Sequence, residues 1–331
     1  MSNSSNTPKT STPKAITSKT DTPKTALSEF SLIERYFKQS STRHTHTVLG
    51  IGDDCAVSDL PSGSELVSCM DTLIIGRHFL PDTSPHAIAY KSVAVNLSDL
   101  SAMGATPYAI LLGLSLPSAD ECWLSQFGRG IHDICREFNI ELIGGDTTKS
   151  ELLTISITAL GTVPKGRAIT RSGAKIGDTI YLGGDVGLAS VTLSQCRQGI
   201  DCDKSAMNYP KPQVALGQAL RGIAHSMIDV SDGLAQDLGH ILSQSGVGAK
   251  LYLDTLPKHP TLTPLSQQQR WQHQLNGGDD YSLVFTAPKT AVLPISDTPI
   301  IAIGEIVATQ GLQLFYQNSP IDLPTQGWQH F

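Results

Sequence analysis

Residues 84–116 read SPHAIAYKSVAVNLSDLSAMGATPYAILLGLSL, and this stretch carries the clearest structural signals of the chain. Ser84 followed by Pro85 predicts the start of a helix, because serine caps the first backbone N–H groups and proline is tolerated at the first helical position. The helix is expected to reach Asp99 near its C-terminal end. The near-continuous apolar run 108–116 then predicts a buried strand. Together they predict one helix–strand unit of an α/β protein.

Further strands and helices precede and follow this unit, and their alternation predicts a layered α/β sandwich. A second amphipathic helix is expected after Asp120, because apolar residues recur there at intervals of three and four. Another helix is expected at 213–225, after Pro212. Strands are expected at residues 65–71, 140–145, 152–163, 179–182, 227–230, 250–254, 281–286, 300–306 and 312–316.

The length of 331 residues favours two domains over one. The second domain is expected to begin after Pro164, which divides the folded chain into residues 27–164 and 165–331. Residues 1–26 consist mainly of Ser, Thr, Pro and Lys. Because such a segment cannot bury apolar area, we expect a disordered tail.

Composition argues against several classes of protein. The net charge of −6 and the absence of a long basic block disfavour nucleic acid as the main partner. No apolar run approaches the roughly 18 residues that span a membrane. The six cysteines contain no CxxC pair, which disfavours a zinc site or a disulfide framework. We therefore expect a cytoplasmic protein in which most cysteines are reduced core thiols.

The aspartates fall at the ends of strands and beside glycine-rich turns. Any single Gly-Asp pair is usually an ordinary turn, but several such pairs in one chain favour a shared site. Glycine lets the backbone approach a ligand closely, and neighbouring acids repel unless a cation neutralises them. Carboxylate oxygens suit Mg²⁺ or Mn²⁺ together with substrate phosphates. The clusters are Asp53–Asp54, Asp71, Asp146, Asp229 with Asp232, and Asp279–Asp280.

Two segments imitate nucleotide-binding motifs. Residues 144–150 resemble a phosphate-binding loop, but Thr148 stands where that pattern requires glycine. Residues 183–187 follow a strand but lack the full spacing of a dinucleotide-binding turn. Ser231 and Asp232 fit a helix cap as well as they fit a binding site.

Taken together, the motifs resemble the thiamine-monophosphate kinase family. They occur in that family's order and cover about residues 28–331. Each motif alone is modestly specific, whereas the ordered set is highly specific. The motifs are GIGDDCA at 50–56, DTL at 71–73, GRHF at 76–79, AVNLSDL at 94–100, GGDTT at 144–148, GRAITRSG at 166–173, IDVSDG at 228–233, GGDDY at 277–281 and GWQHF at 327–331.

The resemblance implies the two-domain α/β fold of the aminoimidazole-ribonucleotide-synthetase-like superfamily. The N-terminal domain is expected to form a homodimer through a β-barrel shared with its mate, and the C-terminal domain to contain a mixed sheet. The implied reaction is in-line transfer of the γ-phosphoryl group of ATP to thiamine monophosphate, which gives thiamine diphosphate and ADP.

The resemblance also implies residue roles, with several Mg²⁺ ions as cofactors and no separate catalytic base. Magnesium ligands are expected at Asp54, Asp71, Asp99, Asp146, Asp229 and Asp232. ATP contacts are expected at Gly145, Asp146, Arg171 and Ser231. Contacts to thiamine monophosphate are expected at His78, Asp279 and Trp328.

The sequence departs from the family pattern at four positions. Cys69 and Met70 stand where the family commonly has Ser or Thr, so only their backbone carbonyls could serve a metal. Asp279 replaces the usual Glu and shortens the acid by one methylene group. Trp328 stands where Tyr is also seen, and either ring can lie against a cationic heterocycle.

Three other functions are less consistent with the sequence than the kinase. Selenophosphate synthetase of the same superfamily needs an N-terminal Cys or selenocysteine, and no cysteine precedes Cys55. Aminoimidazole-ribonucleotide synthetase fits the segment around His78 and the C-terminal aromatic segment less well. A non-catalytic sensor of Mg-ATP or thiamine phosphates would have lost the metal-binding acids.

Overall fold

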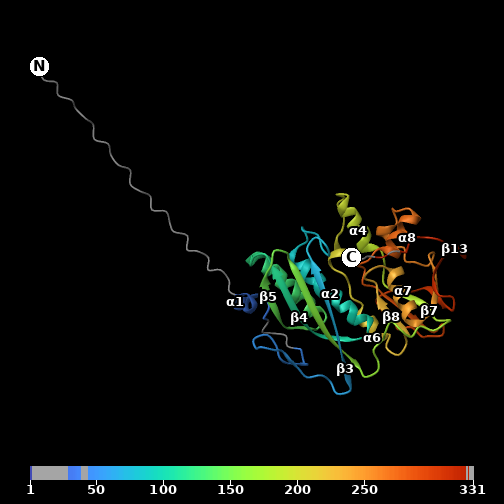
Figure 1. The fold of residues 1–331 in the computed structure, drawn as a ribbon, viewed down its shortest axis with the longest axis horizontal. Coiled ribbons are helices and arrows are strands. Elements are labelled where there is room, and N and C mark those ends of the chain that lie inside the picture. Colours follow the sequence, from blue (N-terminus) through green and yellow to red (C-terminus); the bar gives the residue numbers. More distant parts are fainter. Residues whose placement is uncertain (2–28, 39–43, 326, 328–331) are drawn as a thin grey trace.

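The structure, a computed structural model, describes residues 29–38, 44–325 and 327, together with Met1. Two α/β halves lie side by side, each built on its own sheet (Figure 1). The predicted tail after Met1 and the predicted substrate residue Trp328 fall outside the described residues. The predicted α/β character is confirmed for the described residues.

The N-terminal half contains a four-stranded sheet in the order β3-β6-β4-β5. β4 and β5 are parallel, and the other neighbouring strands are antiparallel. A small hairpin of β1 and β2 lies apart from this sheet. The elements are α1 (Glu29–Tyr36), β1 (Thr47–Leu49), β2 (Val57–Ser58), β3 (Ser64–Ile74), α2 (Pro85–Ala102), β4 (Thr106–Leu116), α3 (Glu121–Glu137), β5 (Glu141–Lys149) and β6 (Thr154–Pro164).

The two long helices of this half begin where the sequence predicts. The Ser84 hydroxyl accepts a hydrogen bond from the Ala87 N–H at 3.3 Å and caps α2. The Asp120 carboxylate accepts one from the Trp123 N–H at 2.7 Å and caps α3. Both predictions are confirmed because a cap is a local signal that needs only the next few residues.

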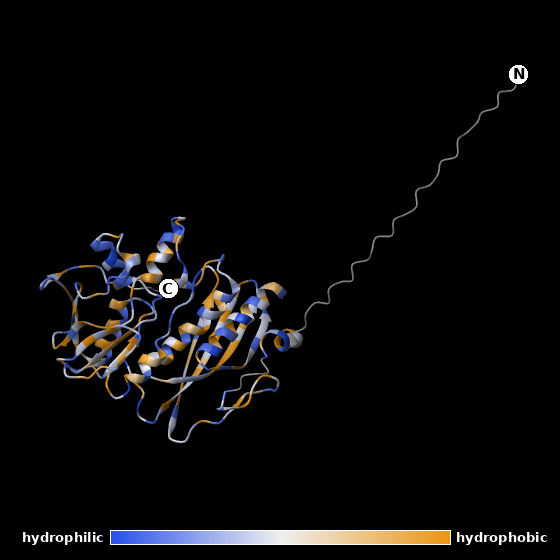
Figure 2. Ribbon diagram, turned by 180° about the vertical axis from the view of Figure 1, so that it is seen from behind, coloured by the Kyte–Doolittle hydropathy of each residue, from blue (hydrophilic) through white to orange (hydrophobic). Residues whose placement is uncertain are grey.

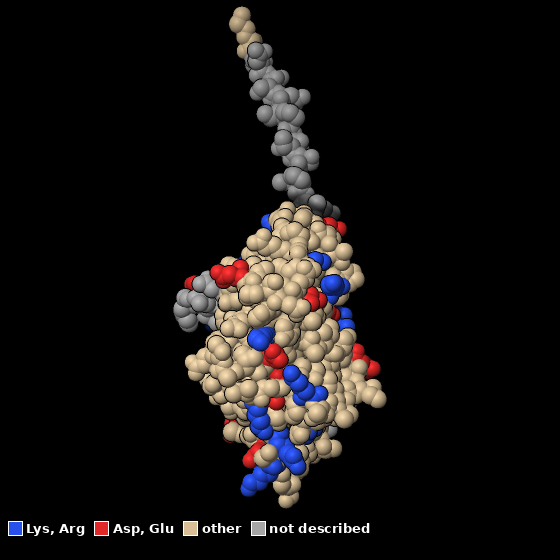
Figure 3. All heavy atoms as spheres, turned by 90° about the vertical axis from the view of Figure 1, so that its right-hand side faces the viewer, with Lys and Arg blue, Asp and Glu red and all other residues tan. Residues whose placement is uncertain are grey.

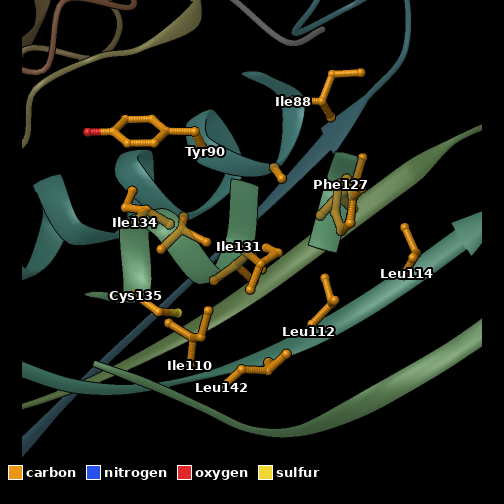
Figure 4. Close-up of a cluster of buried hydrophobic side chains, with 14 of the residues drawn as sticks. Ile88, Tyr90, Ile110, Leu112, Leu114, Phe127, Ile131, Ile134, Cys135 and Leu142 are labelled. Carbon is orange, nitrogen blue, oxygen red and sulfur yellow. The ribbon is translucent and has the colours of Figure 1, made fainter. Parts of the chain in front are cut away.

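The core of this half lies between the sheet and α2 and α3. Ile131 and Ile134 of α3 are fully buried and pack with Leu112 and Leu114 of β4 (Figure 4). Figure 2 shows the hydrophobic residues of both halves gathered where helices meet sheets. The opposite face of the four-stranded sheet is partly covered, because Ala56 and Leu60 pack there against the buried Tyr108 and Ile143. Elsewhere this face is open, and the Met70 side chain is 61% exposed. The open part is available to a partner.

The C-terminal half contains a seven-stranded mixed sheet in the order β13-β12-β9-β11-β7-β10-β8. Only β9 and β12 are parallel among its pairs. The elements are β7 (Thr179–Gly183), α4 (Leu188–Arg197), α5 (Ser205–Asn208), α6 (Val214–Ala219), β8 (Ser226–Asp229), α7 (Leu234–Ser245), β9 (Gly248–Tyr252), the 3₁₀ turn η1 (Pro260–Leu262), α8 (Gln267–Asn276), β10 (Leu283–Ala287), β11 (Ile300–Val307), β12 (Gly311–Tyr316) and β13 (Ser319–Ile321).

Two expectations about the fold need correction or further evidence. The helix predicted at 213–225 is wrong in length, because α6 ends at Ala219 and the chain turns at Gly222, whose φ is 76°. Neither sheet closes into a barrel within the described ranges, and the edges β3 and β5 of the four-stranded sheet stay apart. A barrel shared between two copies therefore stays a prediction.

Helix α2 belongs to both halves of the molecule. It packs against α3 and the four-stranded sheet on one side, and against α5, α6 and β8 on the other. Every residue from Ala87 to Ala102 is buried except Asp99. The approach of α6 is so close that a Cβ atom at Gly217 would lie 2.1 Å from the carbonyl oxygen of Ser101. Only glycine fits there, and α2 joins the two halves into one packed unit.

The surface and the cysteines complete the description. No helix in the described part of the chain is long and apolar enough to cross a membrane. Acidic and basic side chains are interspersed on the face shown in Figure 3, and several basic groups gather at its lower end.

The prediction that most cysteines are core thiols is wrong, because Cys135 is buried, Cys55 and Cys122 are exposed, and the other three are intermediate.

Phe127 offers a test of the N-terminal core. It is fully buried and stacks on Trp123 with ring centroids 4.8 Å apart. We expect Phe127→Ala to lower the free energy of unfolding by about 3–5 kcal/mol, measured by urea denaturation, because the truncation leaves a cavity. The control Val292→Ala, at a side chain that is 87% exposed, should stay within about 0.5 kcal/mol of the parent. A loss below about 1 kcal/mol for Phe127→Ala would contradict this account of the core.

Candidate active site

Three of the predicted aspartates meet where the two halves join. Asp71 lies on β3, Asp99 near the end of α2, and Asp229 at the end of β8. The Asp71 N–H donates to Asn96 Oδ1 at 3.0 Å. The Ser98 hydroxyl donates to Asp229 Oδ2 at 2.7 Å, which ties α2 to the C-terminal sheet. The helix that carries Asp99 therefore also fixes the other two acids.

The electrostatics of this acid cluster, Asp71, Asp99 and Asp229, show how closely its members interact. Burial, followed by the charges of Asp229 and Asp71, raises the pKa of Asp99 to about 8. Burial also raises the pKa of Asp229 to about 6, against the hydrogen bond from Ser98. Each shift means that the negative form is disfavoured in the protein alone. The cluster is thus a place where a cation would be bound favourably.

Arg171 is the predicted ATP residue beside the acid cluster. Its charge lowers the pKa of both Asp99 and Asp229, although less than burial raises them. The residue is exposed, and its carbonyl oxygen accepts a weak hydrogen bond from the Ser245 hydroxyl at 3.5 Å. An exposed guanidinium at the edge of an acidic site can donate hydrogen bonds to phosphate oxygens from its solvent-facing N–H groups.

The turn that follows β8 is organised by a residue that the motifs did not single out. Asp237 of α7 is 2% exposed, and its Oδ2 accepts hydrogen bonds from the N–H groups of Ser231, Asp232 and Gly233, each at 3.0 Å. The interpretation of Ser231 and Asp232 as a helix cap is wrong, because the cap residue is Gly233 and makes no side-chain bond. An acid in the first turn of a helix is the only sequence signal that could have identified Asp237.

The Gly-Gly-Asp-Asp loop at 277–280 gives its two acids different tasks. The carboxylate of Asp280 accepts hydrogen bonds from the N–H groups of Gly187, Leu188 and Ala189 at 2.5, 3.0 and 3.2 Å. These are the first donors of α4, so Asp280 caps that helix from a distant loop. Burial nevertheless raises the pKa of Asp280 to about 7. Asp280 is therefore a structural acid.

Asp279 lies against the turn after β8. Its N–H donates to the Ser231 carbonyl oxygen at 2.8 Å. The loop can approach this closely because a Cβ atom at Gly278 would lie 2.2 Å from the same oxygen. The side chain of Asp279 forms an ion pair with the buried Lys91 of α2. The same Lys91 Nζ donates to the His78 carbonyl oxygen at 3.1 Å, so one lysine contacts both predicted substrate residues that the structure describes.

The predicted residues Asp54, Gly145 and Asp146 lie at or near the edge strand β5, whereas Asp71 lies on the other edge strand, β3. Asp146 and Gly145 belong to β5, and two strands separate β5 from β3, which carries Asp71. Three strand spacings amount to about 14 Å. Asp54 is exposed in the loop before β2, and the neighbouring Gly50 lies against the Glu141 side chain of β5. Whether Asp54 and Asp146 share ions with Asp71, Asp99, Asp229 and Asp232 stays a prediction.

The acid cluster has the donor chemistry of a magnesium site. Its oxygens are carboxylates, of which Asp229 is buried and Asp71 and Asp99 are half-buried. Mg²⁺ prefers a few carboxylates completed by phosphate oxygens and water. Among the described residues, no three His, Cys, Asp or Glu side chains already form a metal-ligand set. The carboxylate donors of Asp71, Asp99 and Asp229 suit Mg²⁺ chemically, and their role as its ligands stays a prediction.

Comparison with known proteins agrees with this geometry. The model of the AIR synthase related protein, N-terminal domain, matches residues 52–163, and that of the C-terminal domain matches residues 175–317. Thiamine-monophosphate kinase of Escherichia coli K12 is 41% identical over 322 residues, which cover 92% of this chain and 99% of the relative. The enzyme of Haemophilus influenzae is 45% identical over 271 residues, covering 80% and 82%.

Solved structures give the same result. The crystal structure of thiamine-monophosphate kinase from Stenotrophomonas maltophilia matches with a TM-score of 0.76 and 38% identity, covering 82% of this chain and 91% of that chain. AaThiL complexed with AMPPCP and TMP matches with a TM-score of 0.73 and 27% identity, covering 82% and 89%. HypE of E. coli, at 19% identity, shares the fold. The chain has the AIR synthase-like fold of two α/β domains with mixed sheets, and it belongs to the thiamine-monophosphate kinase family.

Proposed function

We propose that this phosphotransferase moves the γ-phosphoryl group of ATP to the phosphate of thiamine monophosphate, giving thiamine diphosphate and ADP. The observation that carries the proposal is the acid cluster at the junction of the halves, with Arg171 at its edge. The names of the relatives support the same donor and acceptor, because each of those enzymes is a thiamine-monophosphate kinase.

Both substrates carry phosphate groups, so their approach is opposed by charge repulsion. Asp71, Asp99 and Asp229 would hold Mg²⁺, with Asp232 beside them on the turn after β8. When bound, Mg²⁺ supplies the positive charge that neutralises and aligns the phosphates for in-line transfer. Arg171 donates charge-assisted hydrogen bonds to ATP oxygens. No general base is required, because the acceptor phosphate is already ionised at neutral pH.

The positions of Asp54 and Asp146 support a division of labour among the aspartates. Asp146 and Gly145 lie about three strand spacings from Asp71, or about 14 Å. Because Mg–O distances are about 2.1 Å, we propose separate ions for the two edges of the sheet. We assign Asp54, Asp146 and Gly145 to additional ions and to a more distant part of ATP.

The proposed domain roles follow the two halves. Residues 27–164 would bind ATP and Mg²⁺ and form the dimer, and residues 165–331 would complete the nucleotide and substrate sites. The dimer proposal rests on the open face of the four-stranded sheet, where Leu66 and Met70 are 52% and 61% exposed. Covering that face with the same face of a second copy would bury these side chains and close the shared barrel.

The first test is turnover by the full chain. With ATP, Mg²⁺ and thiamine monophosphate, chromatography should show ADP and thiamine diphosphate in equal amounts. Asp99→Asn should lower kcat/KM by about 100-fold, which corresponds to about 3 kcal/mol of lost transition-state stabilisation. The control Asp297→Asn, at an exposed position between β10 and β11, should keep the parental rate. Folded parent protein that makes no thiamine diphosphate would refute the proposal.

The second test concerns stability without metal. In EDTA, the acid cluster should make the protein less stable as pH rises from about 4 to about 8. The folded pKa of Asp99 is raised to about 8 and that of Asp229 to about 6, so the folded protein keeps protons that the unfolded carboxyls release near pH 3.9. Each group can contribute a slope of up to about 1.4 kcal/mol per pH unit within its own window.

Urea unfolding at several pH values measures this slope. Asp99→Asn removes one titrating carboxyl, so its stability should decline less steeply with pH than that of the parent, whereas Asp297→Asn should follow the parent. Adding Mg²⁺ near pH 8 should raise the stability of the parent more than that of Asp99→Asn. If the free energy of unfolding of the parent and of Asp99→Asn changed identically with pH, Asp99 would not have the raised pKa on which this prediction depends.

A further inference from the structure

Lys91 is a buried cation that belongs to none of the sequence motifs. It lies in the middle of α2 and is 3% exposed. A buried ammonium is unfavourable unless charged or polar partners surround it. It lies about two turns, or about 12 Å, before Asp99 on the same helix.

The partners of Lys91 come from both halves of the molecule. Its Nζ donates to the His78 carbonyl oxygen at 3.1 Å and forms an ion pair with Asp279 Oδ2. His78 follows β3 in the N-terminal half, and Asp279 precedes β10 in the C-terminal half. One ammonium group therefore sets the separation between the two.

Both partners are fixed by further bonds. The Ile74 N–H donates to His78 Nδ1 at 2.9 Å, which orients the imidazole and puts its proton on Nε2 in the neutral ring. The Tyr281 hydroxyl donates to Asp279 Oδ1 at 2.9 Å. Asp279 and Tyr281 both have left-handed backbone angles, with φ of 72° and 57°. Such conformations persist only where the surroundings hold them.

We infer that Lys91 is a positioning residue for the thiamine-monophosphate site. It holds His78 and Asp279 at a fixed separation and neutralises the charge of Asp279, so that this acid is kept apart from the metal-binding aspartates. The inference rests on the proposed function, which assigns His78 and Asp279 to the acceptor substrate. It adds a residue that contacts neither substrate and acts through the two that do.

The shorter acid at 279 strengthens this inference. Both carboxylate oxygens of Asp279 are already engaged, one by Lys91 and the other by Tyr281. An aspartate held in this way cannot swing toward a ligand, so its distance from His78 is decided by the lysine between them. Loss of the ammonium should therefore disturb acceptor binding and leave ATP, which is assigned to other residues, unaffected.

The test compares steady-state constants for both substrates in the full chain. Lys91→Met keeps the length of the side chain and removes the charge. We expect its KM for thiamine monophosphate to rise about tenfold or more, with the KM for ATP changed less than about twofold. Lys91→Arg, which restores a cation and its donors, should recover part of the loss. The matched control Lys250→Met, which breaks a pair with Glu305 on the far sheet, should match the parent in both constants.

A milder variant covers the case in which Lys91→Met does not fold. Tyr281→Phe removes one donor to Asp279 with little change in volume, and should raise the KM for thiamine monophosphate about two- to fivefold. A merely structural lysine would lower the amount of folded enzyme and leave both KM values alone. Unchanged KM values, or equal changes for both substrates, in folded Lys91→Met and Tyr281→Phe overturn the inference. An inactive parent in the same assay refutes the proposed function itself, and the inference falls with it.

Discussion

Repulsion between neighbouring carboxylates at the junction of the halves is the constraint around which the molecule is organised. Asp71, Asp99 and Asp229 come from a strand, a helix and a second strand of the other half. Burial raises the pKa of Asp99 and of Asp229 and so disfavours their charged forms. Such groups stay together only if the backbone that carries them cannot relax. Helix α2 provides this rigidity, because Ser98 bonds to Asp229 and Asn96 bonds to the backbone of Asp71. The acids lower the stability of the metal-free protein, and the same arrangement favours the binding of a cation.

Local signals explain which parts of the fold were predictable. The caps of α2 and α3 are complete within four residues, and the strands of both halves read as apolar runs between turns. Helix α8 was missed because it is almost entirely polar, and its capping box at Ser266 and Gln269 was its one local signal. Helix α4 was missed for another reason, since the acid that caps it lies about 90 residues further along the chain. No sequence window contains both ends of that interaction.

The site was predictable in its residue types and only partly in its arrangement. The motifs identified the acids, and Asp71, Asp99 and Asp229 interact electrostatically where the halves join, while their role as metal ligands stays a prediction. They could not tell that Asp280 caps a helix while the adjacent Asp279 meets Lys91, because that lysine is 188 residues away. They also gave no hint that two strands lie between the acids of β3 and β5. Short sequence patterns identify which acids belong to the site. The task of each acid depends on long-range contacts that form only on folding.

The burial of α2 on all sides limits how this protein can change over generations. A helix at a surface keeps one face on which substitutions are nearly neutral, but from Ala87 to Ala102 almost no such face remains. A mutation there must suit the sheet, the neighbouring helix and the other half at once. Recombination that replaces one half with that of a distant relative would split a single packing surface. The halves are therefore expected to have diverged as a pair, with α2 as their slowest-changing segment.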